Sequence, residues 1–194
     1  MNLCLYGASS DNIDEIYKNA AEALGKALAK CGHSLIFGGG AAGLMGAAAR
    51  GVFSEKGSLI GVSPHFFNVD GVLFEKCTEL IYTETMRERK KKMEELSDGF
   101  MVLPGGIGTY EEFFEILTLK QLGRHKKPIA ILNINGYFNK MLEFMENTVS
   151  EGFMRRSCME LFAVFDSAEK LITYMGNYKE TDYDIHMYKD IKGV

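Results

Sequence analysis

The chain has 194 residues, of which 46% are hydrophobic and 25% charged, and this composition excludes a disordered or fibrous protein. Its 22 basic and 26 acidic residues give a net charge of −4, which disfavours nucleic acid and anionic membranes as partners. Because a chain of this length buries roughly 70% of its unfolded surface, we expect one compact domain over residues 1–176, followed by a polar tail over residues 177–194.

The cysteines and the N-terminus indicate an intracellular protein. Cys4, Cys31, Cys77 and Cys158 lie far apart and form no CxxC pair, which favours reduced thiols and no metal site. The first residues carry neither a basic lead nor a long apolar stretch, so we expect no secretory signal and a cytoplasmic location. The longest uncharged stretch, residues 34–49, is shorter than the ~20 apolar residues of a membrane helix, so no membrane partner is expected.

Short apolar runs alternate with amphipathic segments along the chain. In order, the expected strand and helix pairs are 3–6 with 13–31, 34–37 with 44–55, a strand over 58–62 alone, 79–82 with 85–97, 100–103 with 109–122, 129–132 with 137–151, and 162–165 with 168–175. This alternation predicts an α/β fold, a single Rossmann-like doubly wound parallel sheet with helices on both faces. Ligands of such sheets bind at the carboxyl ends of the strands.

Two glycine-rich loops each follow a predicted strand and open a predicted helix. In the first, Gly38, Gly40 and Gly43 satisfy GxGxxG, the pattern of a phosphate-cradling turn. The next strand lacks the acidic end that holds a dinucleotide ribose, and the alternative is that these glycines only allow tight packing of helix on sheet. The second loop, residues 104–109, also directs amides and a helix N-terminus at an anion. Neither loop has the lysine of a Walker A motif.

An arginine falls on the apolar face of the helix expected over residues 85–97. At ~100° per residue, Arg89 projects with Met86, Met93 and Leu96. A charge directed toward the core is costly unless it is paired or binds a ligand, so Arg89 is a candidate site residue.

A glutamate falls on the apolar face of the next helix. Glu112 projects between Ile116 and Leu119. The alternative is a capping box, in which Thr109 is the N-cap and Glu112 bonds back to its amide. Because Arg89 and Glu112 both lie near carboxyl ends of strands and both fall on apolar faces, a shared pocket is favoured over the cap.

With these residues in view, the chain resembles the Lonely-Guy family of nucleoside 5′-monophosphate phosphoribohydrolases, whose bacterial members were often labelled lysine decarboxylases. The family signature PGGxGTxxE is present as Pro104, Gly105, Gly106, Gly108, Thr109 and Glu112. The preceding Met-x-x-Arg-Lys motif is present as Met86, Arg89 and Lys90. The Gly-Leu-Met-Gly stretch at 43–46 and Gly-Ala-Ser-Ser at 7–10 also fit.

The resemblance implies hydrolysis of the N-glycosidic bond of AMP or an N6-prenylated AMP to free base and ribose 5-phosphate, by a homodimer without a cofactor or metal. It implies Arg89 and Glu112 as catalytic residues. The substrate-binding residues that it implies are Ser9, Gly39, Met86, Lys90, Gly105, Gly106, Gly108 and Thr109. A carboxylate at Glu112 would stabilise positive charge on the sugar, whereas Arg89 would either polarise the departing base or hold the phosphate.

Two departures from the family pattern leave base selectivity open. Arg87 stands where many members have histidine, and residues 63–67 read Ser-Pro-His-Phe-Phe rather than Ile-Pro-x-x-Leu. A competing function is a non-catalytic nucleotide or cofactor carrier of the same fold, which would need the glycine loops but not the Arg89 and Glu112 pair. A pyridoxal phosphate decarboxylase is disfavoured, since no lysine stands out as a Schiff-base candidate.

Overall fold

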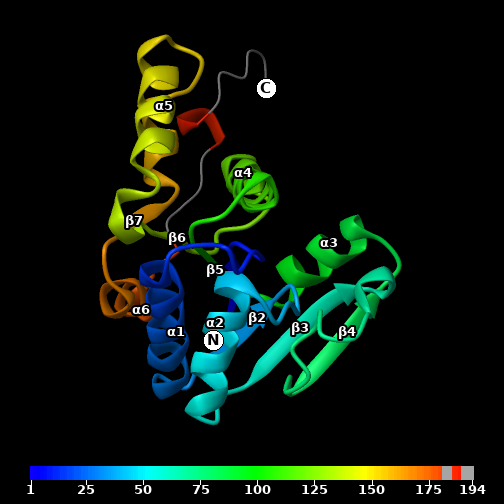
Figure 1. Ribbon diagram of the computed structural model, residues 1–194. Coiled ribbons are helices and arrows are strands. Elements are labelled where there is room, and N and C mark those ends of the chain that lie inside the picture. The colour runs from blue at the N-terminus through cyan, green and yellow to red at the C-terminus, as the bar shows by residue number, and fades with distance from the viewer. Residues whose placement is uncertain (181–184, 189–194) are drawn as a thin grey trace.

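The computed structural model of the protein describes residues 1–180 and 185–188. Of the expected tail over 177–194, residues 181–184 and 189–194 lie outside the described residues. The described part forms one parallel sheet with the strand order β4-β3-β2-β1-β5-β6-β7 (Figure 1). Its strands are β1 (Asn2–Tyr6), β2 (Ser34–Phe37), β3 (Leu59–Pro64), β4 (Glu79–Thr83), β5 (Gly99–Val102), β6 (Ile129–Leu132) and β7 (Ala163–Phe165).

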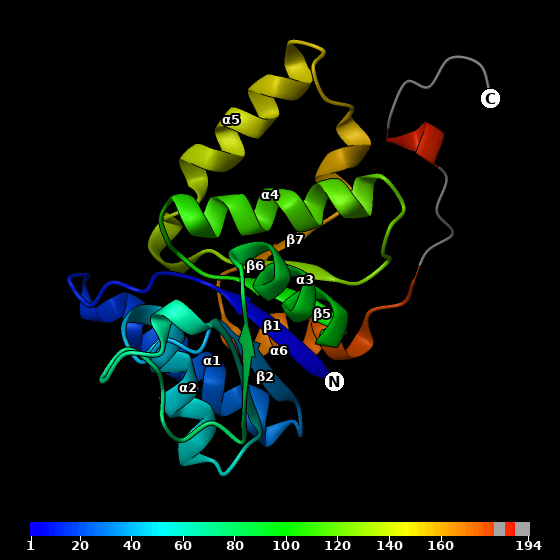
Figure 2. The same cartoon turned by 90° about the vertical axis from the view of Figure 1, so that its right-hand side faces the viewer.

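The described residues contain six α-helices, five of them between strands and α6 after β7. They are α1 (Glu15–Lys30), α2 (Gly43–Ser54), α3 (Met86–Leu96), α4 (Ile107–Gln121), α5 (Asn139–Ser150) and α6 (Ala168–Asn177). Helices α1, α2 and α6 cover one face of the sheet, and α3, α4 and α5 cover the other (Figure 2). The predicted doubly wound parallel sheet is therefore confirmed, with element bounds that differ from the expected ones by a few residues at most. None of the described helices combines the length and apolar character of a bilayer crossing.

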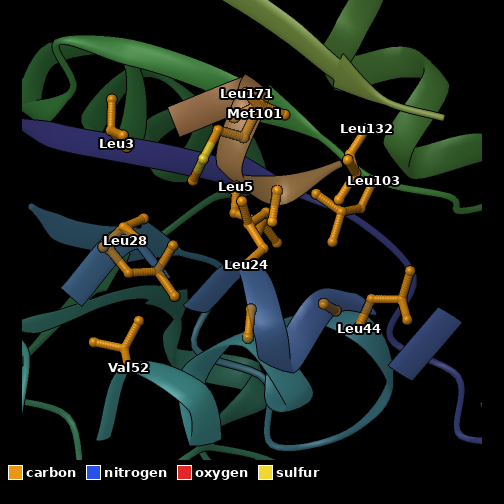
Figure 3. Packing of buried hydrophobic residues seen from close by; sticks show 14 of the residues in the cluster. Leu3, Leu5, Leu24, Leu28, Leu44, Val52, Met101, Leu103, Leu132 and Leu171 are labelled. Atoms are coloured by element: carbon orange, nitrogen blue, oxygen red, sulfur yellow. The ribbon is translucent and has the colours of Figure 1, made fainter. Parts of the chain in front are cut away.

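Alternating side chains of the central strand supply both halves of the core. Leu3 and Leu5 of β1 pack against α1, α2 and α6, while Cys4 and Tyr6 point to the opposite face. Figure 3 shows the first of these clusters, in which Leu24 and Leu28 of α1 lie beneath the sheet. Both faces are buried because a parallel sheet with crossover helices leaves neither face to water.

Two glycines allow α1 and α2 to pack backbone against backbone. A Cβ atom at Gly25 would lie 2.1 Å from the Ala48 carbonyl oxygen, and one at Gly51 would lie 2.2 Å from the Glu22 carbonyl oxygen. This close contact fixes α2, and with it the loop between β2 and α2.

The strand order reverses at β1, which pairs with β2 on one side and β5 on the other. At such a switch point the two connections leave in opposite directions and open a crevice at the carboxyl ends of the strands. The loops after β1, β2 and β5 meet there. Ala8 links them, because its amide donates to the Pro104 carbonyl at 3.0 Å and its carbonyl accepts from the Leu44 amide at 2.8 Å.

Candidate active site

A cavity of about 670 Å³ lies at the carboxyl ends of β1, β2, β3 and β5. Loops following these strands and the starts of α3 and α4 form its wall. The lining residues are Gly7, Ala8, Ser9, Gly38, Gly40, Ala42, Met45, Ser63, Phe67, Gly71, Val72, Leu73, Met86, Arg89, Gly106, Ile107, Gly108, Thr109 and Glu112. The position is the one expected for the ligand of a doubly wound sheet.

Arg89 reaches into this cavity from α3 and is almost fully buried, with 8% of its side chain exposed. Its Nε donates to the Val62 carbonyl at 3.1 Å, and its Nη1 donates to Glu112 Oε1 at 2.9 Å. Its Nη2 occupies the space above Gly38, where a Cβ atom would lie only 2.0 Å away. Three neighbours therefore hold the guanidinium in one orientation, and the cost of burying its charge is offset by these bonds.

Glu112 comes from α4 and has 12% of its side chain exposed. Burial raises the pKa of its carboxyl group above the ordinary value of 4.5, and the charge and hydrogen bond of Arg89 oppose that rise. The carboxylate is thus mostly withdrawn from bulk solvent, in a position where charges are screened less than in water, and it can stabilise a positive charge on a ligand.

The capping-box alternative for Glu112 is wrong. Helix α4 begins at Ile107 with Gly106 as its N-cap, so Thr109 lies within the first turn instead of preceding it. The Glu112 carboxylate bonds Arg89 rather than an N-cap amide. Because Gly106 has an extended backbone with φ −92° and ψ −153°, the chain enters the helix earlier than the position of the threonine suggests.

The first amides of α4 are open. Within the described residues, the amides of Ile107, Gly108 and Thr109 have no hydrogen-bond acceptor, and no side chain caps this helix. By contrast, α1, α3 and α6 are capped by the side chains of Asp14, Thr85 and Ser167, respectively. Unbonded amides and the positive end of the helix dipole together make the start of α4 suited to an anion.

The start of α2, which follows the first glycine-rich loop, is closed, although Gly38 and Gly40 of that loop line the cavity. The Gly43 amide donates to Asp11 Oδ1 at 2.7 Å, and the Leu44 and Met45 amides donate to the Ala8 carbonyl at 2.8 and 3.4 Å. Gly43 has φ +62°, and a Cβ there would lie 2.4 Å from the Ala8 carbonyl oxygen. Gly43 therefore permits close backbone packing, and its amide is already bonded within the chain.

Most of the residues expected at the site meet in the cavity. Ser9, Met86, Gly106, Gly108 and Thr109 line it together with Arg89 and Glu112. Thr109 is 4% exposed, and its hydroxyl lies beneath the loop, 2.1 Å from where a Cβ atom of Gly105 would be.

Three expected binding residues do not line the cavity. Lys90 pairs with Glu111 and, at 2.9 Å, with Glu115, so it fastens α3 to α4 on the outer side of the Arg89 pair. Gly105 is buried beneath its loop, where its carbonyl accepts a hydrogen bond from the Tyr137 hydroxyl at 2.6 Å. Gly39 has φ +77° and its carbonyl accepts from the Phe74 amide at 2.8 Å. These three residues support the walls of the site.

The segment between β3 and β4 adds a wall that the sequence reasoning missed. Phe67, Val72 and Leu73 line the cavity from this segment, and the Val72 carbonyl accepts from the Ala41 amide at 2.9 Å. Ser63, at the end of β3, was missed as well. The irregular segment has no periodicity from which its burial could be deduced, whereas the departure at residues 63–67 was a signal that pointed to this wall.

Structures with the same fold include cofactor carriers. The Moco carrier protein of Chlamydomonas reinhardtii matches with a TM-score of 0.69 at 23% identity, over 90% of this chain and 94% of that chain. The molybdenum cofactor binding protein of Rippkaea orientalis matches with a TM-score of 0.70 at 19% identity, over 90% of this chain and 94% of that chain. At these identities the likeness shows a shared Rossmann-like fold, and the site has to be compared separately.

Relatives found by sequence identify the family of this chain. A cytokinin riboside 5′-monophosphate phosphoribohydrolase of Arabidopsis thaliana is 36% identical over 91% of this chain and 83% of that protein. A protein of the same name from Oryza sativa subsp. japonica is 35% identical over 97% of this chain and 77% of that protein. The family model described as possible lysine decarboxylase matches residues 45–175, which include Arg89 and Glu112. On these matches the chain belongs to that family, the Lonely-Guy family.

Proposed function

We propose that this protein hydrolyses the N-glycosidic bond of a nucleoside 5′-monophosphate, AMP or an N6-substituted AMP, to the free base and ribose 5-phosphate. The observation that carries the proposal is the buried pair of Arg89 and Glu112, 2.9 Å apart, in one cavity with the open amides of α4. The names of the sequence relatives support the same reaction.

Glu112 would act on the sugar. As the bond between C1′ and the base nitrogen breaks, positive charge develops on the ribose, and a weakly screened carboxylate stabilises it. Water then adds its hydroxyl to C1′, and the base nitrogen receives a proton, so the reaction needs no other reactant. The same carboxylate can orient the attacking water and accept its proton, and a raised pKa makes Glu112 a better base for that step.

Arg89 would act on the side of the base. Its guanidinium is bonded to the Val62 carbonyl of β3 and to Glu112 and lies above Gly38 of the loop after β2. Two of these contacts, at Val62 and Gly38, lie on β3 and on the loop after β2, away from the start of α4, and the third is with Glu112 itself. We therefore assign to Arg89 the orientation of Glu112 and the polarisation of the departing base.

The phosphate would bind at the start of α4. The amides of Ile107, Gly108 and Thr109 are unbonded there, and Ser9 lines the same cavity. Binding energy from a phosphate that does not react can hold the ribose in place over Glu112, which lowers the entropic barrier of the reaction.

The direct test is incubation of the purified protein with AMP and, separately, with isopentenyl-AMP, followed by chromatography of free base and ribose 5-phosphate. Release of base from either nucleotide would establish the activity, and the ratio of rates would give the preferred substrate. Tight binding of AMP in a parallel titration without release of base would refute the proposal and favour the carrier function.

We also propose that the protein is a homodimer. The side chains of Phe114 and Phe144, 37% and 66% exposed, border an apolar hollow of about 150 Å³ between α4 and α5, a feature typical of interfaces. Sedimentation equilibrium tests this, since a monomer at micromolar concentration would contradict it. The cytoplasmic location and the absence of a nucleic-acid partner stay predictions.

A further inference from the structure

Ser63 is the buried hydroxyl of the cavity that lacks a good partner. It is 0% exposed and lines the cavity at the end of β3. Within the described residues, the one hydrogen bond of its hydroxyl is a contact of 3.4 Å to the carbonyl of the adjacent Pro64, much longer than the usual 2.7–2.8 Å. Buried hydroxyl groups in native proteins normally have a good partner, which for a residue lining a cavity is a ligand or a water molecule.

The other buried serine shows the usual arrangement. Ser97 is 3% exposed, lies outside the cavity, and donates to the Met93 carbonyl at 2.5 Å. Burial of serine in this fold is therefore compatible with a full hydrogen bond. The poorly bonded hydroxyl belongs to the serine that lines the cavity.

The position of Ser63 corresponds to the far end of a nucleotide. Strand β3 is three strands from β5, whose loop leads to the open amides of α4, and three spacings in a sheet amount to roughly 14 Å. That span is comparable with the length of an extended nucleoside monophosphate from its phosphorus to the exocyclic group of its base. Arg89 lies between the two ends, bonded to the neighbouring Val62 carbonyl and to Glu112.

The surroundings of Ser63 suit a flat base with one polar edge. Phe67, Leu73 and Met86 line the cavity along with it and supply apolar surface. A hydroxyl oxygen keeps its acceptor lone pairs whichever way its O–H turns, and no group of the described residues donates to the Ser63 oxygen. The group that fits is an N–H donor at the edge of the base.

We propose that Ser63 is a specificity-determining residue, whose hydroxyl oxygen accepts a hydrogen bond from the exocyclic amino group of a purine base. The assignment rests on the proposed function and adds the means of base selection. Adenine carries such a donor, and an N6-monosubstituted adenine keeps one N–H. A purine without the amino group leaves the hydroxyl buried and poorly bonded, so a site of this kind selects against it.

The test is a cycle with two changes, Ser63→Ala on the protein and removal of the amino group on the ligand. The four values of kcat/KM come from wild type and Ser63→Ala, each with AMP and with purine riboside 5′-monophosphate. We expect Ser63→Ala to lower kcat/KM for AMP about 5- to 10-fold and to leave that for purine riboside 5′-monophosphate unchanged. The preference of the enzyme for AMP then shrinks by the same factor.

Ser97→Ala is the matched control, because it removes a buried hydroxyl far from the base and should leave the preference unaltered. An equal loss on both nucleotides, or no loss on either, would overturn the assignment. Dissociation constants for the same four pairs, measured by calorimetry, give the preference even without turnover. Failure of wild type to release any base would thus refute the proposed function, while the binding cycle still decides the role of Ser63.

Discussion

Gly38→Ala should displace Arg89 without changing any charged group. The new Cβ atom would lie 2.0 Å from Arg89 Nη2 and 3.1 Å from its Cζ. Since ordinary contacts begin near 3.4 Å, the guanidinium must move away by about 1.4 Å. A shift of that size breaks or weakens the bonds from Arg89 to Glu112 and to the Val62 carbonyl, which are 2.9 and 3.1 Å long.

Three consequences follow from that displacement. Turnover should fall about 100-fold, the usual result of misplacing a reacting group by about 1 Å. The free energy of unfolding should fall by about 2–4 kcal/mol, because a buried charge pair loses much of its hydrogen bonding. Because Arg89 lowers the pKa of Glu112, its withdrawal should also move the acid limb of the pH–rate profile to higher pH.

The assays are base release from the nucleotide, its pH dependence, and urea unfolding. Gly176→Ala is the control, because a Cβ atom at this position in α6 meets nothing within 4 Å. Its stability should equal or exceed that of wild type, since alanine favours a helix more than glycine does. A Gly38→Ala variant with turnover within threefold of wild type would refute the account of how Arg89 is held.

Three further predictions concern single side chains. Glu112→Gln should keep nucleotide affinity and lose most turnover, and rapid turnover by this variant would show that Glu112 has a structural role only. Because the pKa of Glu112 is raised, the kcat/KM of wild type should fall on acidification at a pH above 4.5. Neutral His125 donates from Nε2 to the Ile116 carbonyl and accepts at Nδ1 from the Lys127 amide. Burial lowers its pKa from 6.5 to about 4, so its stabilising effect is complete above pH 6.5 and is lost as the pH falls toward 4. The free energy of unfolding, measured in urea, should fall by about 3 kcal/mol over that pH window in wild type but not in His125→Gln. An equal dependence on pH in both proteins would contradict this prediction. Asp11→Ala should lower the free energy of unfolding by about 1 kcal/mol, because the Gly43 amide loses its acceptor. Thermal unfolding identical to that of wild type would show that this hydrogen bond does not stabilise α2.

The two charged residues of the site could be located from the spacing of apolar residues in each helix. Arg89 and Glu112 could be chosen from the sequence because each interrupts an apolar stripe, and a helix converts that spacing into a shared direction. Their convergence followed from a second rule, that parallel strands bring their carboxyl ends to one edge of the sheet. The structure places both in one cavity, with the carboxylate on the guanidinium.

The state of the two glycine loops was decided by contacts between distant segments. Both loops have the sequence of an anion site, yet Asp11, 32 residues from Gly43, closes the start of α2, and nothing described closes the start of α4. Lys90 likewise has the motif position of a binding residue but pairs with Glu111, 21 residues away.

Periodicity therefore determined which segments form the sheet and helices, and which charged residues face inward, because burial of a regular element repeats along its own sequence. Tertiary structure decided which amides stay open, where α4 begins, and that Ser63 and Leu73 complete the cavity. Hydrogen-bond partners and irregular walls come from segments far apart in the chain, and no local pattern records which of them will meet.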